Sequence, residues 1–73
     1  MSSNHEVKAE VGGSVWKIEV AVGQSVAEGD TLLIVESMKM EIPLASPIAG
    51  TVQEIRVAES DMVDEDQVLL VIG

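Results

Sequence analysis

One lysine stands apart among the side chains of this sequence that could take part in chemistry. Lys39 is one of four Lys and Arg residues among 73, and it lies near the middle of the chain, between Met38 and Met40 and shortly after Glu36. An amine on a long flexible stem can carry an attached group, provided that a rigid scaffold presents it. The remaining basic residues fall in predicted strands, where we expect solvated side chains: Lys8, Lys17 and Arg56.

The segment around Lys39 joins two halves of the chain that repeat one another. Residues 11–36 align with residues 48–73 at a constant offset of 37, and nine of the 26 aligned positions are identical, including Gly13/Gly50. Each copy of a repeat is usually one supersecondary unit that cannot bury its apolar face alone. Two copies therefore predict two sheets that face each other across a pseudo-twofold axis, with Lys39 in the crossing between them.

Hydrophobic periodicity predicts strands along the whole chain. Residues 14–20 alternate between apolar and polar, which places Trp16, Ile18 and Val20 on one face. Residues 31–35 form a short apolar run that is typical of a buried strand, and the second repeat copies this plan. No segment has the i, i+3, i+4 spacing of a helix. The predicted fold is therefore all-β.

Size and composition limit the kinds of protein that this chain can be. Its 73 residues suit one small domain, which we place at residues 7–73, after a flexible lead at residues 1–6. The formal net charge of −9 would repel nucleic acid and anionic membrane surfaces, so a basic protein surface is the expected partner. There is no Cys, and no apolar run approaches the roughly 20 residues of a membrane-spanning helix. These features favour a cytoplasmic location.

Signatures of enzymes and metal sites are absent from the sequence. There is no nucleophile, phosphate-loop or zinc motif, and the single His, His5, lies in the polar lead. The run from Glu59 to Asp66 holds five carboxylates without the spacing or the Gly of a calcium loop, which favours a solvated turn. Trp16, the only aromatic residue, is better explained as a half-exposed side chain that fills the small core than as a ligand platform. We therefore expect no catalytic residue and no metal ligand.

The position of Lys39 between the repeats predicts a hairpin tip. A two-residue turn between antiparallel strands prefers Asn-Gly or Gly-X, because the primed turns need positive φ. Met38 and Lys39 would break that preference at about 1–3 kcal/mol per residue, which suggests that these side chains are kept for a function. A looser loop with a solvated Lys39 is the alternative, and the spacing alone leaves both open.

The residues around the tip also resemble a known family. The run E-S-M-K-M-E-I-P-L from Glu36, followed by S-P-I-A-G-T-V, resembles the attachment motif of biotinyl domains, with Ser37 where Ala is common. The resemblance covers residues 11–73 and includes the G-x-x-V-x-x-G-D turn that starts at Gly23. It implies a flattened β-barrel or sandwich of two four-stranded antiparallel sheets, a barrel-sandwich hybrid. It also implies biotin in amide linkage to Lys39, with three neighbours completing the cofactor-binding site: Met38, Met40 and Glu36.

The resemblance also implies partners and a function. A biotin protein ligase would modify Lys39, and the domain, itself not catalytic, would shuttle a carboxyl group from a biotin carboxylase to a carboxyltransferase of an acyl-CoA carboxylase system. The segment between Trp16 and Val26 has no insertion, so the chain resembles the thumbless type. Two alternatives remain open. One is a lipoyl carrier of a 2-oxo acid dehydrogenase system, whose family has a D-K-A-like motif at the tip. The other is an unmodified barrel that acts as an interaction module.

Overall fold

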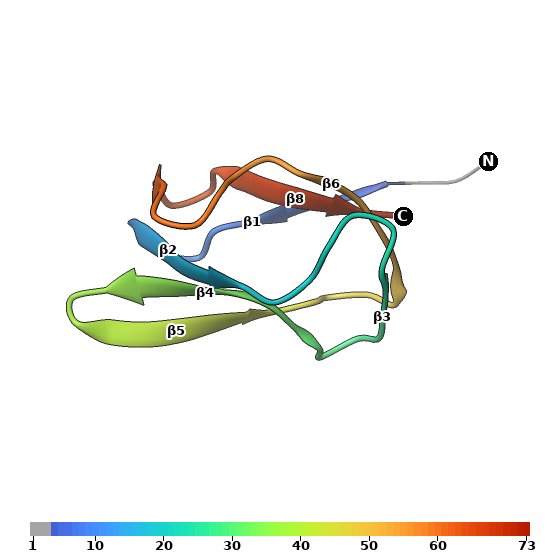
Figure 1. Cartoon of the computed structure of the whole chain (residues 1–73), viewed down its shortest axis with the longest axis horizontal. Coiled ribbons are helices and arrows are strands. Elements are labelled where there is room, and N and C mark those ends of the chain that lie inside the picture. The colour runs from blue at the N-terminus through green and yellow to red at the C-terminus, as the bar shows by residue number, and fades with distance from the viewer. Residues whose placement is uncertain (1–3) are drawn as a thin grey trace.

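Eight strands form two four-stranded antiparallel sheets in the computed structural model, which describes residues 4–73 (Figure 1). The first sheet contains, in spatial order, β1 (His5–Lys8), β8 (Val68–Ile72), β6 (Gly50–Ile55) and β3 (Ser25–Val26). The second contains β5 (Met40–Ala45), β4 (Thr31–Ser37), β2 (Gly13–Ile18) and β7 (Met62–Val63). The sheets do not close into one barrel, and the predicted all-β class with two four-stranded sheets is confirmed. Residues 4–73 include no helix long and apolar enough to cross a membrane.

The internal repeat of the sequence appears as a pseudo-twofold symmetry of the fold. An offset of 37 residues carries β2 onto β6, β3 onto β7 and the start of β4 onto the start of β8. The repeats exchange their short strands, since β3 of the first repeat pairs with β6 and β7 of the second repeat pairs with β2. Neither half completes a sheet alone, so the two halves must fold together to bury their apolar faces.

Bulges explain why the buried strands are continuous apolar runs. Leu32 and Leu33 are both fully buried, although neighbours in a regular strand point to opposite faces. The register between β4 and β5 shifts at Leu32, and the matching shift between β8 and β1 falls at Leu69, its repeat-mate. A bulge adds one residue to one strand, which lets two consecutive side chains turn toward the core. The symmetric pair of bulges therefore places four leucines at the centre of the molecule: Leu32, Leu33, Leu69 and Leu70.

A further bulge in β2 changes the expected orientation of Trp16. The register between β2 and β4 shifts between Val15 and Lys17, so Trp16 is the extra residue. Val15 is buried and Ile18 is half-buried, whereas Trp16 is 48% exposed and lies outside the core cluster. Trp16 is half exposed as predicted, but the predictions that it fills the core and shares a face with Ile18 are wrong. Periodicity in the sequence does not reveal where a bulge reverses the alternation.

Four turns of one design connect the short strands to their neighbours. In each turn the N–H of the fourth residue donates to the carbonyl of the first at 3.1 Å, and the side chain of the fourth accepts from the N–H of the first at 2.9–3.1 Å. The third residue has positive φ in every case: Gly23, Gly29, Ser60 and Asp66. Two of these turns, residues 58–61 and 64–67, overlap the acidic run, so the run is an ordered part of the scaffold.

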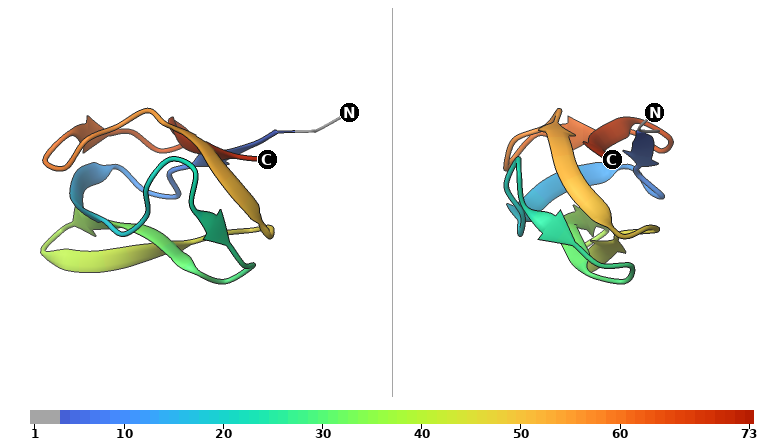
Figure 2. Two further views of the ribbon diagram at one scale, coloured as in Figure 1. Left: turned by 45° about the vertical axis from the view of Figure 1, so that its right-hand side comes forward. Right: turned by 90° about the vertical axis from the view of Figure 1, so that its right-hand side faces the viewer.

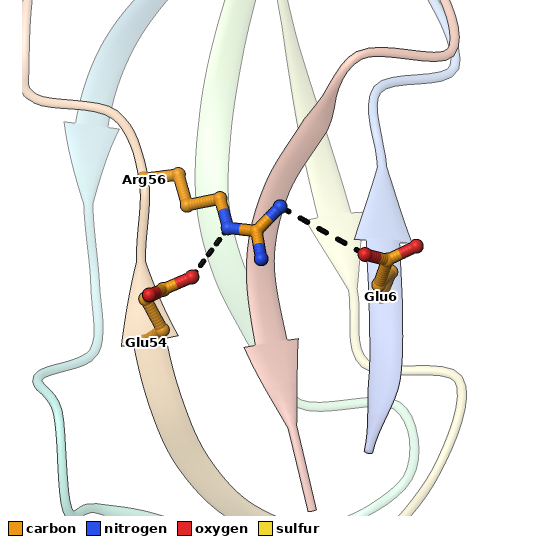
Figure 3. A network of polar contacts seen from close by, with 3 residues as sticks. All are labelled: Glu6, Glu54 and Arg56. Atoms are coloured by element: carbon orange, nitrogen blue, oxygen red, sulfur yellow. Dashed lines mark hydrogen bonds and ion pairs between the residues drawn. The ribbon is translucent and has the colours of Figure 1, made fainter.

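The first strand begins within the predicted flexible lead. His5 and Glu6 pair with the end of β8 as part of β1, while residues 1–3 lie outside the described residues. Arg56 reaches this strand across β8: its guanidinium donates a hydrogen bond to Glu54 and lies 3.8 Å from the Glu6 carboxylate (Figure 3). The hydrogen bond to Glu54, with the negative charges of Glu54 and Glu6, raises the pKa of Arg56 above its ordinary value.

Candidate functional site

The predicted hairpin tip is a tight turn in the structure. β4 and β5 pair from Thr31 opposite Ala45 up to Ser37 opposite Met40, which leaves only Met38 and Lys39 in the turn. Both have positive φ, 53° at Met38 and 65° at Lys39, and a two-residue loop with positive φ at both positions is the type I′ pattern. The looser loop is therefore excluded. Neither residue is the Asn or Gly that such a turn prefers, so the tip stores backbone strain.

The tip lies at one end of an elongated molecule. The described structure measures 39 × 18 × 17 Å, and the turn between β4 and β5 lies at the end opposite the C-terminus and the start of β1 (Figures 1 and 2). Below the turn, β5 forms the edge of the second sheet and β4 is one of its central strands, where Leu33 and Val35 are buried. The base of the hairpin is thus anchored in the core, whereas its turn projects into solvent.

The side chains of the tip project into solvent. Lys39 is exposed, as predicted, and the exposed fractions of Met38 and Met40 are 92% and 65%. Within residues 4–73, Lys39 forms no ion pair, whereas Lys17 lies 3.4 Å from Glu19 and Arg56 pairs with two carboxylates. The amine is therefore available to solvent and to another protein.

Two carboxylates flank the turn on the outer face of the sheet. Glu36, which the sequence indicated, lies directly opposite Glu41 in the β4–β5 pair, and both are exposed. Like charges that face each other across a sheet are destabilising. Glu41 was not identified from the sequence, although Glu36 and Glu41 are equally far from the centre of the Met38–Lys39 turn. A two-residue turn therefore implied this pairing.

Gly13 sets the distance between the hairpin and the neighbouring strand. A Cβ atom at Gly13 would overlap the carbonyl oxygen of Glu36 in β4. A Cβ at Gly50, its repeat-mate, would lie 2.8 Å from a side-chain methyl of Ile72 and 3.1 Å from the carbonyl oxygen of Gly73. The identity of this position in both repeats therefore reflects a close approach between strands, and Gly13 supports the base of the hairpin that presents Lys39.

The geometry suits covalent attachment of a group through the amine. Lys combines an exposed nucleophilic nitrogen with a four-carbon stem that rotates freely, while the two-residue turn holds the α-carbon in place. An acyl group joined to this nitrogen would not have to displace a neighbouring side chain of the domain, because the tip side chains are exposed. The residues present therefore fit a carboxylic-acid cofactor in amide linkage.

Comparisons with known proteins agree with this geometry. The family model Biotin_lipoyl, described as "Biotin-requiring enzyme", matches residues 2–72. The chain belongs to the biotin/lipoyl attachment family. It is similar to the Biotin/lipoyl attachment protein of Bacillus subtilis (strain 168), with 41% identity over 64 residues that cover 88% of each chain. It is also 37% identical over 68 residues to the Biotinylated protein TB7.3 homolog of Mycobacterium leprae, which covers 93% of this chain and 96% of the relative.

A solved structure places the same fold within a much larger protein. The Kluyveromyces lactis urea carboxylase matches the whole chain with a TM-score of 0.93 and 32% identity, but the match spans only 6% of that protein. These relatives confirm the predicted biotinyl domain and its cofactor, covalent biotin. The connection between β2 and β3 comprises residues 19–24, the same length as residues 56–61 between β6 and β7. The family member described here thus has the thumbless form.

Proposed function

We propose that this protein is a biotin carboxyl carrier in which biotin is joined to the Nζ atom of Lys39. The observation that carries the proposal is the exposed Lys39 at a two-residue turn whose backbone conformation disfavours both of its residues. An unfavourable turn at the tip of an otherwise regular hairpin indicates that these side chains serve a purpose other than stability. The alignment of Met38, Lys39 and Met40 with the M-K-M motif of biotinyl domains also supports Lys39 as the attachment site.

The chain itself contributes presentation and contact. The hairpin fixes the α-carbon of Lys39, and the stem lets its end turn toward different active sites. Amide formation removes one positive charge, which takes the formal net charge of the chain from −9 to −10. Met38 and Met40 offer flexible apolar side chains that can adapt to several partner surfaces. Biotin supplies the nitrogen that accepts and releases a carboxyl group.

The partners follow from this role. We propose that a biotin protein ligase modifies Lys39, that a biotin carboxylase loads the carboxyl group and that a carboxyltransferase unloads it, all in the cytoplasm. The acceptor that we propose, an acyl-CoA, is selected by the carboxyltransferase rather than by this domain. A similar domain in a carboxylase supports the carrier role, and the domain needs no catalytic residue of its own. Capture of the biotinylated protein from an extract of its source, followed by identification of the companion chains, tests these assignments.

Labelling of a matched pair of lysine variants tests the attachment site. Purified protein is incubated with a biotin protein ligase, ATP and biotin, and the intact mass is measured. Wild-type protein and Lys8→Arg should each gain one biotin, because Lys8 is an exposed strand residue away from the tip. Lys39→Arg should gain none, since a guanidinium remains protonated and does not replace the amine. Undiminished labelling of Lys39→Arg would refute the site, and labelling by a lipoate ligase alone would favour the lipoyl carrier.

A further inference from the structure

One row of residues crosses the whole sheet just below the tip. Met62 of β7 lies opposite Ser14 of β2, Ser14 lies opposite Glu36 of β4, and Glu36 lies opposite Glu41 of β5. Residues directly opposite in antiparallel strands share a face, and here that face points away from the core because Glu36, Glu41 and Met62 are all exposed. Since neighbouring strands lie about 4.8 Å apart, Met62 is roughly 10 Å from Glu36 across the sheet.

The same face carries an apolar pair that breaks the symmetry of the repeat. Met62 is 76% exposed, and Trp16, which follows Ser14 by two positions in β2, is 48% exposed. Their repeat-mates on the opposite sheet are polar: Gln53 corresponds to Trp16, and Ser25 corresponds to Met62. Both sheets have equivalent strands and bulges, so the fold accepts polar residues at these positions. The fold therefore does not require an apolar pair at these positions on the sheet that presents Lys39.

We propose that the outer face formed by Trp16, Met62, Glu36 and Glu41 is the surface on which the biotin protein ligase docks. This inference rests on the proposed function and adds an orientation to it: the ligase approaches over the β5-β4-β2-β7 sheet rather than over the opposite sheet. Its contact surface should contain an apolar recess for Trp16 and Met62, bordered by Lys or Arg residues that face the two carboxylates. Large apolar side chains in a polar surround are the usual energetic centre of a protein interface.

Reach explains why the ligase is the partner that fits this face. Before modification, the reacting nitrogen stands only a four-carbon stem away from the backbone of the turn. An enzyme that brings its active site to this nitrogen must therefore cover the tip and the sheet immediately below it, which is where the row of Met62, Glu36 and Glu41 lies. After modification the reacting atom lies at the end of a longer arm. Enzymes that act on the modified domain can then work with less contact to the sheet.

Charge complementarity points to the same kind of partner. Glu36 and Glu41 face each other without an ion-pair partner among residues 4–73. A basic partner surface would relieve their mutual repulsion and accelerate encounter with a domain whose net charge is −9. The encounter rate should fall as salt concentration rises, because these carboxylates are exposed.

The test replaces the apolar pair with the residues that the repeat already uses. In the double variant Trp16→Gln/Met62→Ser, each position receives its repeat-mate, and Val22→Ser serves as the control because Val22 is 62% exposed on a turn beside β6. Initial rates of biotin incorporation are measured below saturation with a biotin protein ligase from the same source, and thermal unfolding is followed by circular dichroism. We expect the double variant to lose on the order of tenfold in kcat/KM through a raised KM, while the control stays at the wild-type rate. The double variant should unfold at a somewhat lower temperature, because about half of the Trp16 side chain is buried, so rates are compared at a temperature at which all three proteins are folded.

The outcomes separate this inference from the function on which it rests. If the ligase labels wild-type protein and labels the folded double variant equally fast, the docking face is refuted while the carrier function stands. If the ligase does not label wild-type protein at all, the proposed function fails. Biotinylated double variant should also be loaded by biotin carboxylase at the wild-type rate. A loss at that step alone would assign the face to the carboxylase and overturn the proposal.

Discussion

Met38→Asn should stabilise the protein although it removes a large apolar side chain. Met38 has a φ of 53° in the turn that presents Lys39, a conformation that side chains with a Cβ atom adopt at a penalty. Asn adopts it more readily because its short polar side chain can bond to the local backbone, and Asn is a preferred first residue of a type I′ turn. The substitution leaves Lys39 and the net charge unchanged, so only the turn is altered.

The magnitude follows from the backbone and from the exposure of the side chain. A left-handed conformation costs an ordinary residue roughly 1–2 kcal/mol, and Asn relieves about 1 kcal/mol of this penalty. Met38 is 92% exposed, so its removal sacrifices almost no buried apolar area. For a domain of 60–100 residues, about 1 kcal/mol corresponds to a rise of roughly 4–8 °C in the unfolding temperature.

Thermal unfolding followed by circular dichroism measures this gain, with Met62→Asn as the control. Met62 is also an exposed methionine, but it lies in β7 and is absent from the positive-φ residues, so Asn there should not raise the unfolding temperature. An unfolding temperature of Met38→Asn at or below that of wild type would contradict the claim that the tip is strained. Labelling of Met38→Asn by the ligase should be slower than wild type, since the turn is intact but the apolar contact is gone.

Two further pairs of substitutions test the scaffold that holds the tip. Gly13→Ala should lower the free energy of unfolding by roughly 1–3 kcal/mol, measured by urea denaturation, because its Cβ meets the backbone oxygen of Glu36. Gly50→Ala should lower it less, since the nearest atom there is a side-chain methyl; equal losses would contradict the close approach to β4. Ser60→Gly and Asp66→Gly, both at positive φ, should each raise the free energy of unfolding by about 0.5 kcal/mol, after the entropic penalty of Gly. Thermal unfolding checks this gain, labelling of Lys39 should be unchanged, and a loss of stability would show that these turns are unstrained.

Local patterns in the sequence were sufficient to predict the strands and the position of the hairpin tip. The two-residue alternation of apolar and polar residues predicted the strands, and the repeat at an offset of 37 predicted that they form two related sheets. The segment between the repeats placed Lys39 at a turn. These inferences succeeded because each depends on residues that are close in the chain or on a comparison of the chain with itself. The M-K-M motif then indicated biotin as the attached group. Lys39 as the attachment site stays a prediction until labelling is measured.

The residues that the sequence misplaced are those whose environment depends on pairing between strands. Trp16 was expected to fill the core, but the bulge in β2 directs it outward. Glu6 was assigned to a flexible lead, yet it pairs with β8 and lies near Arg56. In both cases the deciding contact comes from a strand that is distant in sequence. Propensity and period carry no information about that contact.

The sequence by itself therefore determined which residues alternate, where the chain repeats and which amine lies between the copies. Only the tertiary structure decided that Met38 and Lys39 adopt positive φ, that Glu36 faces Glu41, and that Met62 joins them in one row across four strands. The physical reason is that alternation is a property of a single strand, whereas register and bulges are chosen when strands from both repeats pack around one core.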